Sequence, residues 1–535
     1  MKIGGHMKRS RREFLKATAH SGALLALSGV AGMAAEAQAK PAKSQNHATP
    51  NAREPGLTIH KGHIFHIAGS PKVTEAAAML EWFPDGALAV DGAGRIVFCG
   101  NWKDRPPHLS AAKVIDHQGG YLLPGFIDTH MHFPQVFCGD AYGGGQLPEW
   151  LNNCVFPSEG LLADPTYARM AAIEWCDRMI SSGTTMGLIF GSAFPHAQDF
   201  LFQTAKERGL RMVCGRGIET VAPDWSKQKT SEEEAVRLVR AEIEKWHPLT
   251  EEARKDALQF VAIVPRFSLS VTPKTMAALG DLYAEYRERG VYFTSHLNEN
   301  ARPKTGEIDM TKEKYQVENY LDTYDGKFLP GSQVGGKSFL GKRSVFAHGV
   351  HCTDAELARL AETGSSIAHC PVSQLFLGSG TMPWRRTVAS GVNVSIGSDY
   401  GGGDEFFIPQ ILNACFKVHI SERTPVGIDP YPIDDQSISL HPAELLFTGT
   451  LAGARALDQE DRFGNFDVGK EADFVVLDPA KCPTYGRTLK NMYQHPSPKI
   501  ARDAHLFAVI MLARETAVSS TYVRGRKLKT SKDLM

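Results

Sequence analysis

The sequence predicts an α/β fold, a (β/α)8 barrel of the TIM type, together with a small β-sandwich built from both ends of the chain. Three observations support this. Between about residues 119 and 455, short apolar runs alternate with amphipathic helical stretches, as in parallel βα units. Short β-like runs separated by turns occur on both sides of this region. Metal-ligating residue types follow several of the apolar runs, where a barrel places its active site.

The barrel region contains eight candidate strands and several candidate helices. The segment 300–340 has weak periodicity and many Gly, Lys and Asp residues, so we expect a lid or an inserted loop there. The strands are expected at 126–132, 184–190, 211–216, 260–265, 292–296, 344–348, 366–369 and 393–399. The helices include 167–181, 232–246, 273–289, 354–363 and 442–456.

The two ends of the chain are expected to share the second domain. A hairpin turn is expected at 524–526, where the sequence reads Arg-Gly-Arg. We assign residues 56–118 and 456–530 to one composite β-sandwich, and 119–455 to the barrel. The β-like runs behind this assignment are 58–68, 87–90 and 95–99 before the barrel, and 473–477 and 519–523 after it.

The first 39 residues have the order of an export signal. The twin-arginine pattern SRREFLK occupies 10–16, an apolar stretch rich in Ala and Gly follows, and AQA at 37–39 offers a cleavage site. The apolar stretch contains too much Gly and Ser for a stable membrane anchor. We therefore expect a periplasmic or otherwise exported protein with the Tat translocase as a transient partner, and a linker at 40–55.

Composition excludes several kinds of ligand and framework. The 59 Lys and Arg residues balance the 59 Asp and Glu residues, and no basic block indicates a nucleic-acid partner. The nine cysteines are scattered and never form a C-x-x-C pair, which argues against a disulfide framework or a cysteine-held zinc. A small molecule is therefore the expected ligand.

A His-x-His pair ends the first candidate strand. His130 and His132 are two residues apart, so their imidazoles point to the same side of a strand. Two such rings suit zinc, which binds imidazole nitrogen at about 2.0–2.1 Å. The pattern alone is weak evidence, but an apolar strand that enters from the turn Pro124-Gly125 strengthens it.

Four further residues follow later candidate strands. His296 and Glu299 come at the end of the fifth run, His348 ends the sixth and Asp399 ends the eighth. A His at such a position can be a third metal ligand, and a Glu shortly beyond it can transfer a proton. Each residue alone is more often structural, but five ligand-type residues at the strand ends of one barrel are hard to attribute to chance.

This ordered set resembles the amidohydrolase superfamily, in which His-x-His follows the first barrel strand, His the fifth, His the sixth and Asp the eighth. Within the superfamily the chain is similar to the guanine deaminases. The first two of six similar segments are the more specific, because zinc binding does not require them. The segments are PGFIDTHMHFPQ at 124–135, PRFSLS at 265–270, HLNEN at 296–300, FAHGVH at 346–351, IAHCPVSQLFLGSG at 367–380 and GSDYGG at 397–402.

The resemblance implies one zinc ion per chain and three catalytic residues. Glu299 corresponds to the proton shuttle, His348 to the residue that steadies the attacking oxygen, and Asp399 to a second group that takes a proton from the attacking water. His and carboxylate ligands also accept iron or another divalent metal. The residues that correspond to the zinc ligands are His130, His132, His296 and Asp399.

The resemblance also implies a base-binding group, formed by Gln135, Arg266 and Phe267. An Arg fork can donate two hydrogen bonds to the O6 and N7 edge of a purine. A Gln amide can both donate and accept along another edge. The implied reaction is hydrolytic deamination of a purine-like base, with guanine converted to xanthine and ammonia.

The substrate stays open at this point, because the chain departs from the family pattern near the implied pocket. Gln374 replaces the usual Asn after Ser373, Tyr400 replaces a small apolar residue, and Asn298 replaces a commoner Ser or Asp. None of these differences falls on a candidate metal ligand. Another aminated or halogenated heterocycle, such as 8-oxoguanine, a triazine or a pterin-like ring, is therefore an alternative substrate.

Other classes of protein fit the sequence less well. A cytidine-deaminase-type site needs H-x-E and P-C-x-x-C, which are absent. A binuclear amidase normally needs a bridging Lys after the fourth strand, where this chain has Pro265-Arg266-Phe267. A non-catalytic binding protein would usually have lost metal residues, whereas this chain keeps them all. We therefore expect a mononuclear hydrolase of a small heterocycle, assembled as a homodimer.

Overall fold

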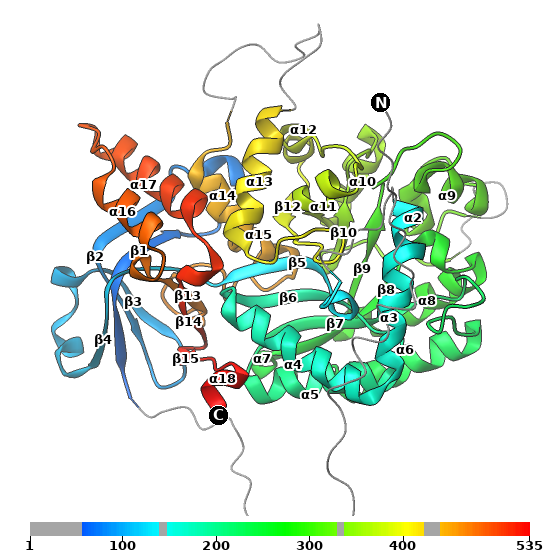
Figure 1. Cartoon of the computed structure of the whole chain (residues 1–535), viewed down its shortest axis with the longest axis horizontal. Coiled ribbons are helices and arrows are strands. Elements are labelled where there is room, and N and C mark those ends of the chain that lie inside the picture. The colour runs from blue at the N-terminus through cyan, green and yellow to red at the C-terminus, as the bar shows by residue number, and fades with distance from the viewer. Residues whose placement is uncertain (1–55, 139–146, 329–335, 422–438) are drawn as a thin grey trace, which may run out of the picture. The chain divides into compact units, whose positions relative to one another are not determined.

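The computed structural model describes residues 56–138, 147–328, 336–421 and 439–535, so the export signal and linker expected at 1–55 lie outside the described residues. Two sheets organise this part of the chain, one of eight parallel strands and one of seven mixed strands (Figure 1). Within these ranges, no helix is both long enough and apolar enough to cross a membrane.

The eight-stranded sheet is the expected barrel. Its strands follow one another in sequence order, and each pairs in parallel with the next. The fold class predicted from the sequence is therefore confirmed. The strands are β5 (Phe126–His132), β6 (Thr184–Gly191), β7 (Arg211–Ile218), β8 (Gln259–Pro265), β9 (Tyr292–Leu297), β10 (Ser344–His348), β11 (Ser366–His369) and β12 (Asn393–Ile396).

Contacts between β12 and β5 complete the circle of strands. The Thr129 hydroxyl lies 2.8 Å from the Ser395 hydroxyl and donates to the carbonyl of Ile396 over 2.7 Å. Just beyond β12, the amide of Asp399 donates to the carbonyl of His130 over 2.8 Å. The first and last strands of the barrel thus hold the residues after β12 against the end of β5.

The barrel strands are nearly continuous apolar runs because both of their faces are covered. All residues of β5 and β6 are buried. Ile127, Leu188 and Val213 belong to a packed cluster that Leu457 and Phe463 share. The hydroxyl of Tyr292, the first residue of β9, donates to the carbonyl of Leu457 over 2.9 Å. Residues after the last barrel helix therefore pack at the amino end of the strands.

Helices cover the outside of the barrel close to the expected positions. The stretch expected at 442–456 is two helices, because Thr450 leaves the helical region (φ −135°, ψ −87°) and its hydroxyl donates to the carbonyl of Leu446. The helices of this region are α4 (Pro165–Ser181), α5 (Pro195–Arg208), α6 (Glu232–Trp246), α7 (Glu251–Asp256), α8 (Pro273–Tyr286), α9 (Glu307–Tyr315), α10 (Asp354–Thr363), α11 (Pro371–Phe376), α12 (Trp384–Ala389), α13 (Ile408–Ser421), α14 (Pro442–Gly449) and α15 (Leu451–Ala456).

Both ends of the chain contribute to the seven-stranded sheet, in which blue and orange-to-red strands lie side by side (Figure 1). β4 (Lys113–Pro124), which the sequence did not reveal, joins the two ends. It pairs in parallel with β1 and antiparallel with β13. The strand order is β15-β14-β13-β4-β1-β2-β3. The other strands are β1 (Thr58–Ile67), β2 (Leu80–Val90), β3 (Ile96–Asn101), β13 (Phe474–Leu477), β14 (Val518–Val523) and β15 (Arg526–Lys527).

Two helices between β13 and β14 were not expected, namely α16 (Pro483–Asn491) and α17 (Pro498–Leu512). α17 packs against α13 and α14 of the barrel region. The amide of Asn413 in α13 donates to the carbonyl of Met511 in α17 over 3.0 Å. The small domain therefore contacts the barrel through helices as well as through its sheet.

The segment 300–340 is packed rather than loose in its described residues. Tyr315, Tyr320 and Tyr324 are buried there. Tyr324 donates to the carbonyl of His296, and Tyr315 to that of Ser268, both over 2.9 Å. The inserted segment thus braces the end of β9 and the residues that follow β8.

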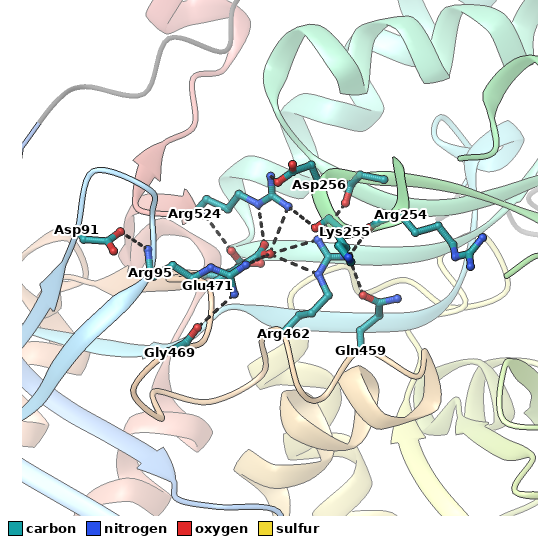
Figure 2. A network of polar contacts seen from close by, with 12 residues as sticks. Asp91, Arg95, Arg254, Lys255, Asp256, Gln459, Arg462, Gly469, Glu471 and Arg524 are labelled. Carbon is teal, nitrogen blue, oxygen red and sulfur yellow. Dashed lines mark hydrogen bonds and ion pairs between the residues drawn. The ribbon is translucent and has the colours of Figure 1, made fainter. Parts of the chain in front are cut away.

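A buried ion cluster ties the terminal segments to the amino end of β7, and Figure 2 shows its contacts around Glu471, Arg462 and Arg524. Arg211, the first residue of β7, forms ion pairs with Glu471 and Asp473, and all three side chains are buried. Arg462 and Arg524 bind the same Glu471 carboxylate at 3.3 and 2.6 Å. Burial alone would raise the pKa of Glu471, but Arg211, Arg524 and Arg462 hold it well below its usual range.

Replacing Glu471 with Gln is expected to lower the free energy of unfolding by about 3–5 kcal/mol, because four guanidinium groups, including that of Arg95, lose a shared countercharge. The stabilisation exists near neutral pH and is lost as the pH falls below about 4.3, the pKa of a free Glu. Urea unfolding followed by circular dichroism measures the change. Glu252→Gln, which breaks an exposed pair with Lys255, is the control and should leave the midpoint unchanged. Equal effects of the two variants would contradict the assignment.

Candidate functional site

Five ligand-type side chains meet at the carboxyl ends of the barrel strands. His130 and His132 belong to β5, His296 to β9 and His348 to β10, and Asp399 follows β12. One ligand atom from each of His130, His296, His348 and Asp399 lies within 4.8 Å of the others. His132 belongs to the same cluster, because its Nε2 is 3.1 Å from Asp399 Oδ1 and 3.3 Å from His296 Nε2.

The donor atoms of this cluster fit a divalent metal ion. His130 Nε2 faces Asp399 Oδ1 at 3.1 Å without hydrogen-bond geometry, and no hydrogen bond to either ring nitrogen of His348 is found in the described part of the chain. Buried polar atoms normally have a partner, so this group of inward-facing nitrogens suits a cation. The structure thus supports metal binding by these residues and leaves the identity of the metal open.

The protonation states of the cluster residues also favour metal binding. His296 Nδ1 is 2.5 Å from the carbonyl oxygen of Arg266, which can only accept, so Nδ1 carries the hydrogen and Nε2 offers its lone pair. Burial and the neighbouring histidines hold the pKa of His296 well below its usual range, and burial lowers that of His348 to about 3. Burial opposes ionisation of Asp399, but His130 and His132 hold its pKa well below the usual range. Neutral imidazoles beside a carboxylate are the forms that bind metal.

The backbone at two of these residues is strained. His348 (φ 74°) and Asp399 (φ 48°) occupy the left-handed region, which costs a non-glycine residue about 1–3 kcal/mol. The amides of Gly402 and Gly403 donate to the carbonyl of Asp399 over 2.9 and 2.8 Å and hold its turn. Such conformations persist where the surroundings impose them, and they turn both side chains toward the cluster.

Asp128, which the sequence analysis did not single out, braces the cluster from behind. Its Oδ1 accepts from the amides of His130 and Ser398, each over 3.1 Å. Burial raises its pKa to about 6. Its place inside the PGFIDTHMH motif was the available signal, but an Asp within a strand has no pattern that distinguishes a bracing role.

Glu299 lies beside the cluster as a buried acid. Its Oε2 is 3.4 Å from His348 Nε2, and its Oε1 accepts from the Ser379 hydroxyl over 3.1 Å. Burial raises the pKa of Glu299 well above its ordinary value, and the carboxyls of Glu307 and Asp399 add to the effect. The raised pKa favours the protonated form of Glu299, which a general acid requires. Ser379 and Glu307 were missed because isolated residues of these types give no pattern.

A cavity opens onto this group of residues. Its lining combines apolar and polar side chains, which suits a flat ring with polar edges. Gln374 and Tyr400, two of the departures from the family pattern, are not among the residues that line it. The apolar lining residues are Leu147, Trp150, Leu151, Phe267 and Leu377, and the polar ones are His132, Gln135, Arg266, His296, Glu299, Glu307 and Asp399.

Two of the polar lining residues, Gln135 and Arg266, belong to an acid–arginine network. Arg266 Nη1 donates to both carboxylate oxygens of Glu159, over 2.9 and 2.7 Å, and to Glu219 over 3.3 Å. Gln135 Nε2 donates to Glu159 over 2.9 Å. Burial raises the pKa of Glu219 to about 7, although Arg266 opposes this. The two acids were not found from the sequence, because they lie far from Arg266 along the chain.

Comparison with known proteins gives a consistent result. The model of the amidohydrolase family matches residues 121–528. A probable guanine deaminase of Deinococcus radiodurans is 37% identical over 461 residues, which cover 85% of this chain and 95% of that protein. Guanine deaminase of Escherichia coli is 34% identical over 455 residues, 84% of this chain and 93% of that protein. The solved structure of E. coli guanine deaminase has a TM-score of 0.74 at 32% identity and covers 89% of this chain and 100% of that chain.

Removal of one cluster residue is expected to remove bound metal. The His296→Ala variant loses a nitrogen that faces Asp399 and three other imidazoles, so its metal content should fall well below the wild-type value of about one divalent ion per chain. Elemental analysis of purified folded protein measures this. His196→Asn is a matched control, because His196 contacts the carbonyl of Leu162 and stands outside the cluster. Full metal content in both variants would rule out His296 as a ligand.

Proposed function

The chain belongs to the amidohydrolase family and is an aminohydrolase that acts on C–N bonds, and we propose that it converts guanine to xanthine and ammonia. One observation carries the proposal. A single cavity is lined by the ligand-type residues His132, His296 and Asp399. The same cavity is lined by Glu299, whose pKa is raised, and by Gln135 and Arg266, which can bind the edges of a base. The identity with guanine deaminases along most of the chain supports the same substrate.

We propose zinc as the metal, held by His130, His132, His296 and Asp399. When bound, zinc makes hydroxide available from water near neutral pH. The chain contributes a buried site in which burial lowers the pKa values of His132, His296 and His348, while nearby histidines hold the pKa of Asp399 low. Iron or another divalent ion stays an alternative that elemental analysis of the native protein can distinguish.

Glu299 supplies the proton that the ring needs. As an oxygen adds to the carbon that bears the amino group, the protonated Glu299 carboxyl delivers a proton to the adjacent ring nitrogen. The Ser379 hydroxyl donates to Oε1, which leaves Oε2 as the oxygen that carries the proton. The ionised Glu299 can then take a proton from the attacking oxygen and pass it to the amino group, which departs as ammonia.

His348 and Asp399 act on the attacking oxygen. His348 Nε2 lies 3.9 Å from Asp399 Oδ2 and 3.4 Å from Glu299 Oε2, so a ring N–H there can stabilise the negative charge that develops on this oxygen. Asp399 stays ionised because its pKa is held low, so it can accept a proton from the water as attack begins. The two groups divide charge stabilisation and proton removal between them.

Ammonia release by purified, metal-analysed protein tests the proposal, with guanine, 8-oxoguanine, adenine, cytosine and melamine as candidate substrates. Guanine should give xanthine and ammonia in equal amounts. The Glu299→Gln variant should keep its metal and lose about 10²–10⁴-fold in rate, because it cannot transfer the proton. Release of ammonia from another base while guanine is inert would refute guanine as the substrate. Near-normal turnover by Glu299→Gln would remove Glu299 from the mechanism.

We also propose export through the twin-arginine pathway, with the Tat translocase as a transient partner and a homodimer as the exported form. The support is the SRREFLK pattern and the AQA site, which precede the described residues. Free thiols are found at Cys99, Cys138, Cys176, Cys214, Cys352, Cys370 and Cys482, which suits a route that carries proteins already folded.

A precursor with Arg11 and Arg12 both changed to Lys should stay in the cytoplasm, because the translocase reads the arginine pair. Cell fractionation with immunodetection measures the distribution. Arg9→Lys, immediately before the pattern, should leave export unchanged. Normal export of the double variant would refute this pathway.

A further inference from the structure

We propose that Glu159 is a positioning residue that sets which base the cavity accepts, because it fixes the Gln135 amide with its carbonyl oxygen as the free acceptor. This inference deepens the proposed function and rests on it. Glu159 ends the short helix α3 (Phe156–Glu159), stands outside the cavity lining and is 4% exposed. It therefore acts on a substrate only through the residues that it holds.

The Glu159 carboxylate has contacts on both oxygens. Oε1 accepts from Gln135 Nε2 and from Arg266 Nη1, each over 2.9 Å, and Oε2 accepts from Arg266 Nη1 over 2.7 Å. A carboxylate paired with Arg266 is an acceptor only. Gln135 must therefore turn its NH2 group toward Glu159, since the flipped amide would place two acceptors against each other in a buried site.

The orientation of Gln135 leaves its carbonyl oxygen for a ligand. Gln135 Oε1 is buried, and no hydrogen bond to it is found among the described residues. It lies beside Gly401, two residues after Asp399, and any side chain at Gly401 would collide with this oxygen. Gly401 also has φ +110°, which only glycine adopts readily. The absence of a side chain at Gly401 thus makes room for this acceptor, which belongs to a residue that lines the cavity.

Arg266 complements this acceptor with donors. The hydrogen bonds of its guanidinium within the described ranges all start at Nη1 and end on Glu159 and Glu219. Its Nε and Nη2 groups therefore remain as the donors available to a substrate. The polar lining of the cavity consequently presents donors from Arg266 and an acceptor from Gln135.

This pattern matches one edge of a 6-oxopurine. O6 accepts a hydrogen bond and the neighbouring N1–H donates one, so both find partners on Arg266 and Gln135. A 6-aminopurine has the reverse pattern, because its amino group donates and its N1 accepts. Sites built around buried hydrogen bonds reject a mismatched ligand strongly, since polar groups are left unpaired. Glu159 thereby selects a 6-oxo over a 6-amino base without touching either.

Glu219 provides a matched comparison inside the same network. It is a buried Glu that accepts from the same Arg266 Nη1 over 3.3 Å. No contact between Glu219 and Gln135 is found in the described part of the chain. Loss of the Glu219 charge removes one charged partner of Arg266 but leaves the Gln135 amide held by Glu159.

The affinities of the metal-loaded, full-length enzyme for hypoxanthine and adenine measure its preference for a 6-oxo over a 6-amino base. Neither base has a 2-amino group, so calorimetry measures affinity without the guanine reaction. The wild type should prefer hypoxanthine by about 100-fold or more. E159Q should reduce this preference about tenfold or more, because a Gln at 159 can donate to a flipped Gln135. E219Q should weaken both bases but keep the preference, and E159D, which still offers a carboxylate, should also keep it.

The outcomes separate this inference from the proposed function. A wild type that binds neither base would refute the 6-oxopurine substrate, and this inference with it. A wild type that prefers hypoxanthine together with an E159Q variant of unchanged preference would refute only the role of Glu159. Equal loss of preference in E159Q and E219Q would assign the effect to the charge of Arg266 and also refute it. Thermal unfolding shows whether E159Q is folded. If it is not, E159D takes its place, and a loss of preference in folded E159D would refute the role of Glu159.

Discussion

Closure of the barrel between β12 and β5 is the constraint on which the site depends. Thr129 bonds to Ser395 and Ile396 across this seam, and the Asp399 amide bonds to the His130 carbonyl just beyond it. His130 and Asp399, the first and last of the ligand-type residues in the sequence, thereby become neighbours. Asp399 then faces the two imidazoles of β5 in a buried space, where histidine nitrogens offset its charge. The left-handed turn at Asp399 is the local conformational cost of this approach.

The same low-dielectric surroundings give two carboxyl groups opposite protonation states. Asp399 stays ionised because histidine nitrogens surround it. Burial and the nearby carboxyls of Glu307 and Asp399 raise the pKa of Glu299, and the hydrogen bond from Ser379 opposes this only in part. An acid and a base for one reaction thus come from residues of the same type in different environments. Arg266 shows a third solution, in which two buried acids balance one cation.

The barrel could be predicted from the sequence because parallel strands covered on both faces are apolar runs, and the order of His and Asp residues after them carried the family resemblance. β4 was missed because its first half reads as polar residues and Gly119-Gly120, which do not alternate like a strand. The helix break at Thr450 depends on one residue's backbone, and the preceding Gly449 alone does not predict a break, because a single Gly is tolerated within a helix. Glu159, Glu219 and Ser379 were missed because only folding brings these isolated residues to Arg266 and Glu299.

β7 connects the stabilising and the chemical parts of the molecule within eight residues. Arg211 begins the strand in the ion cluster with Glu471 and Asp473, and Glu219 directly follows its last residue, Ile218, to pair with Arg266. Barrels commonly place stability at the amino ends of their strands and catalysis at the carboxyl ends. In this chain each end of β7 is held by a buried ion pair with another segment. Arg211 pairs with Glu471 and Asp473 at the amino end, and Glu219 pairs with Arg266 beyond the carboxyl end. Anchoring at Arg211 limits how far Glu219 can move, and with it the guanidinium that Glu159 and Glu219 share. The terminal sheet therefore helps to hold Arg266 in the cavity lining, although it contributes no residue to that lining itself.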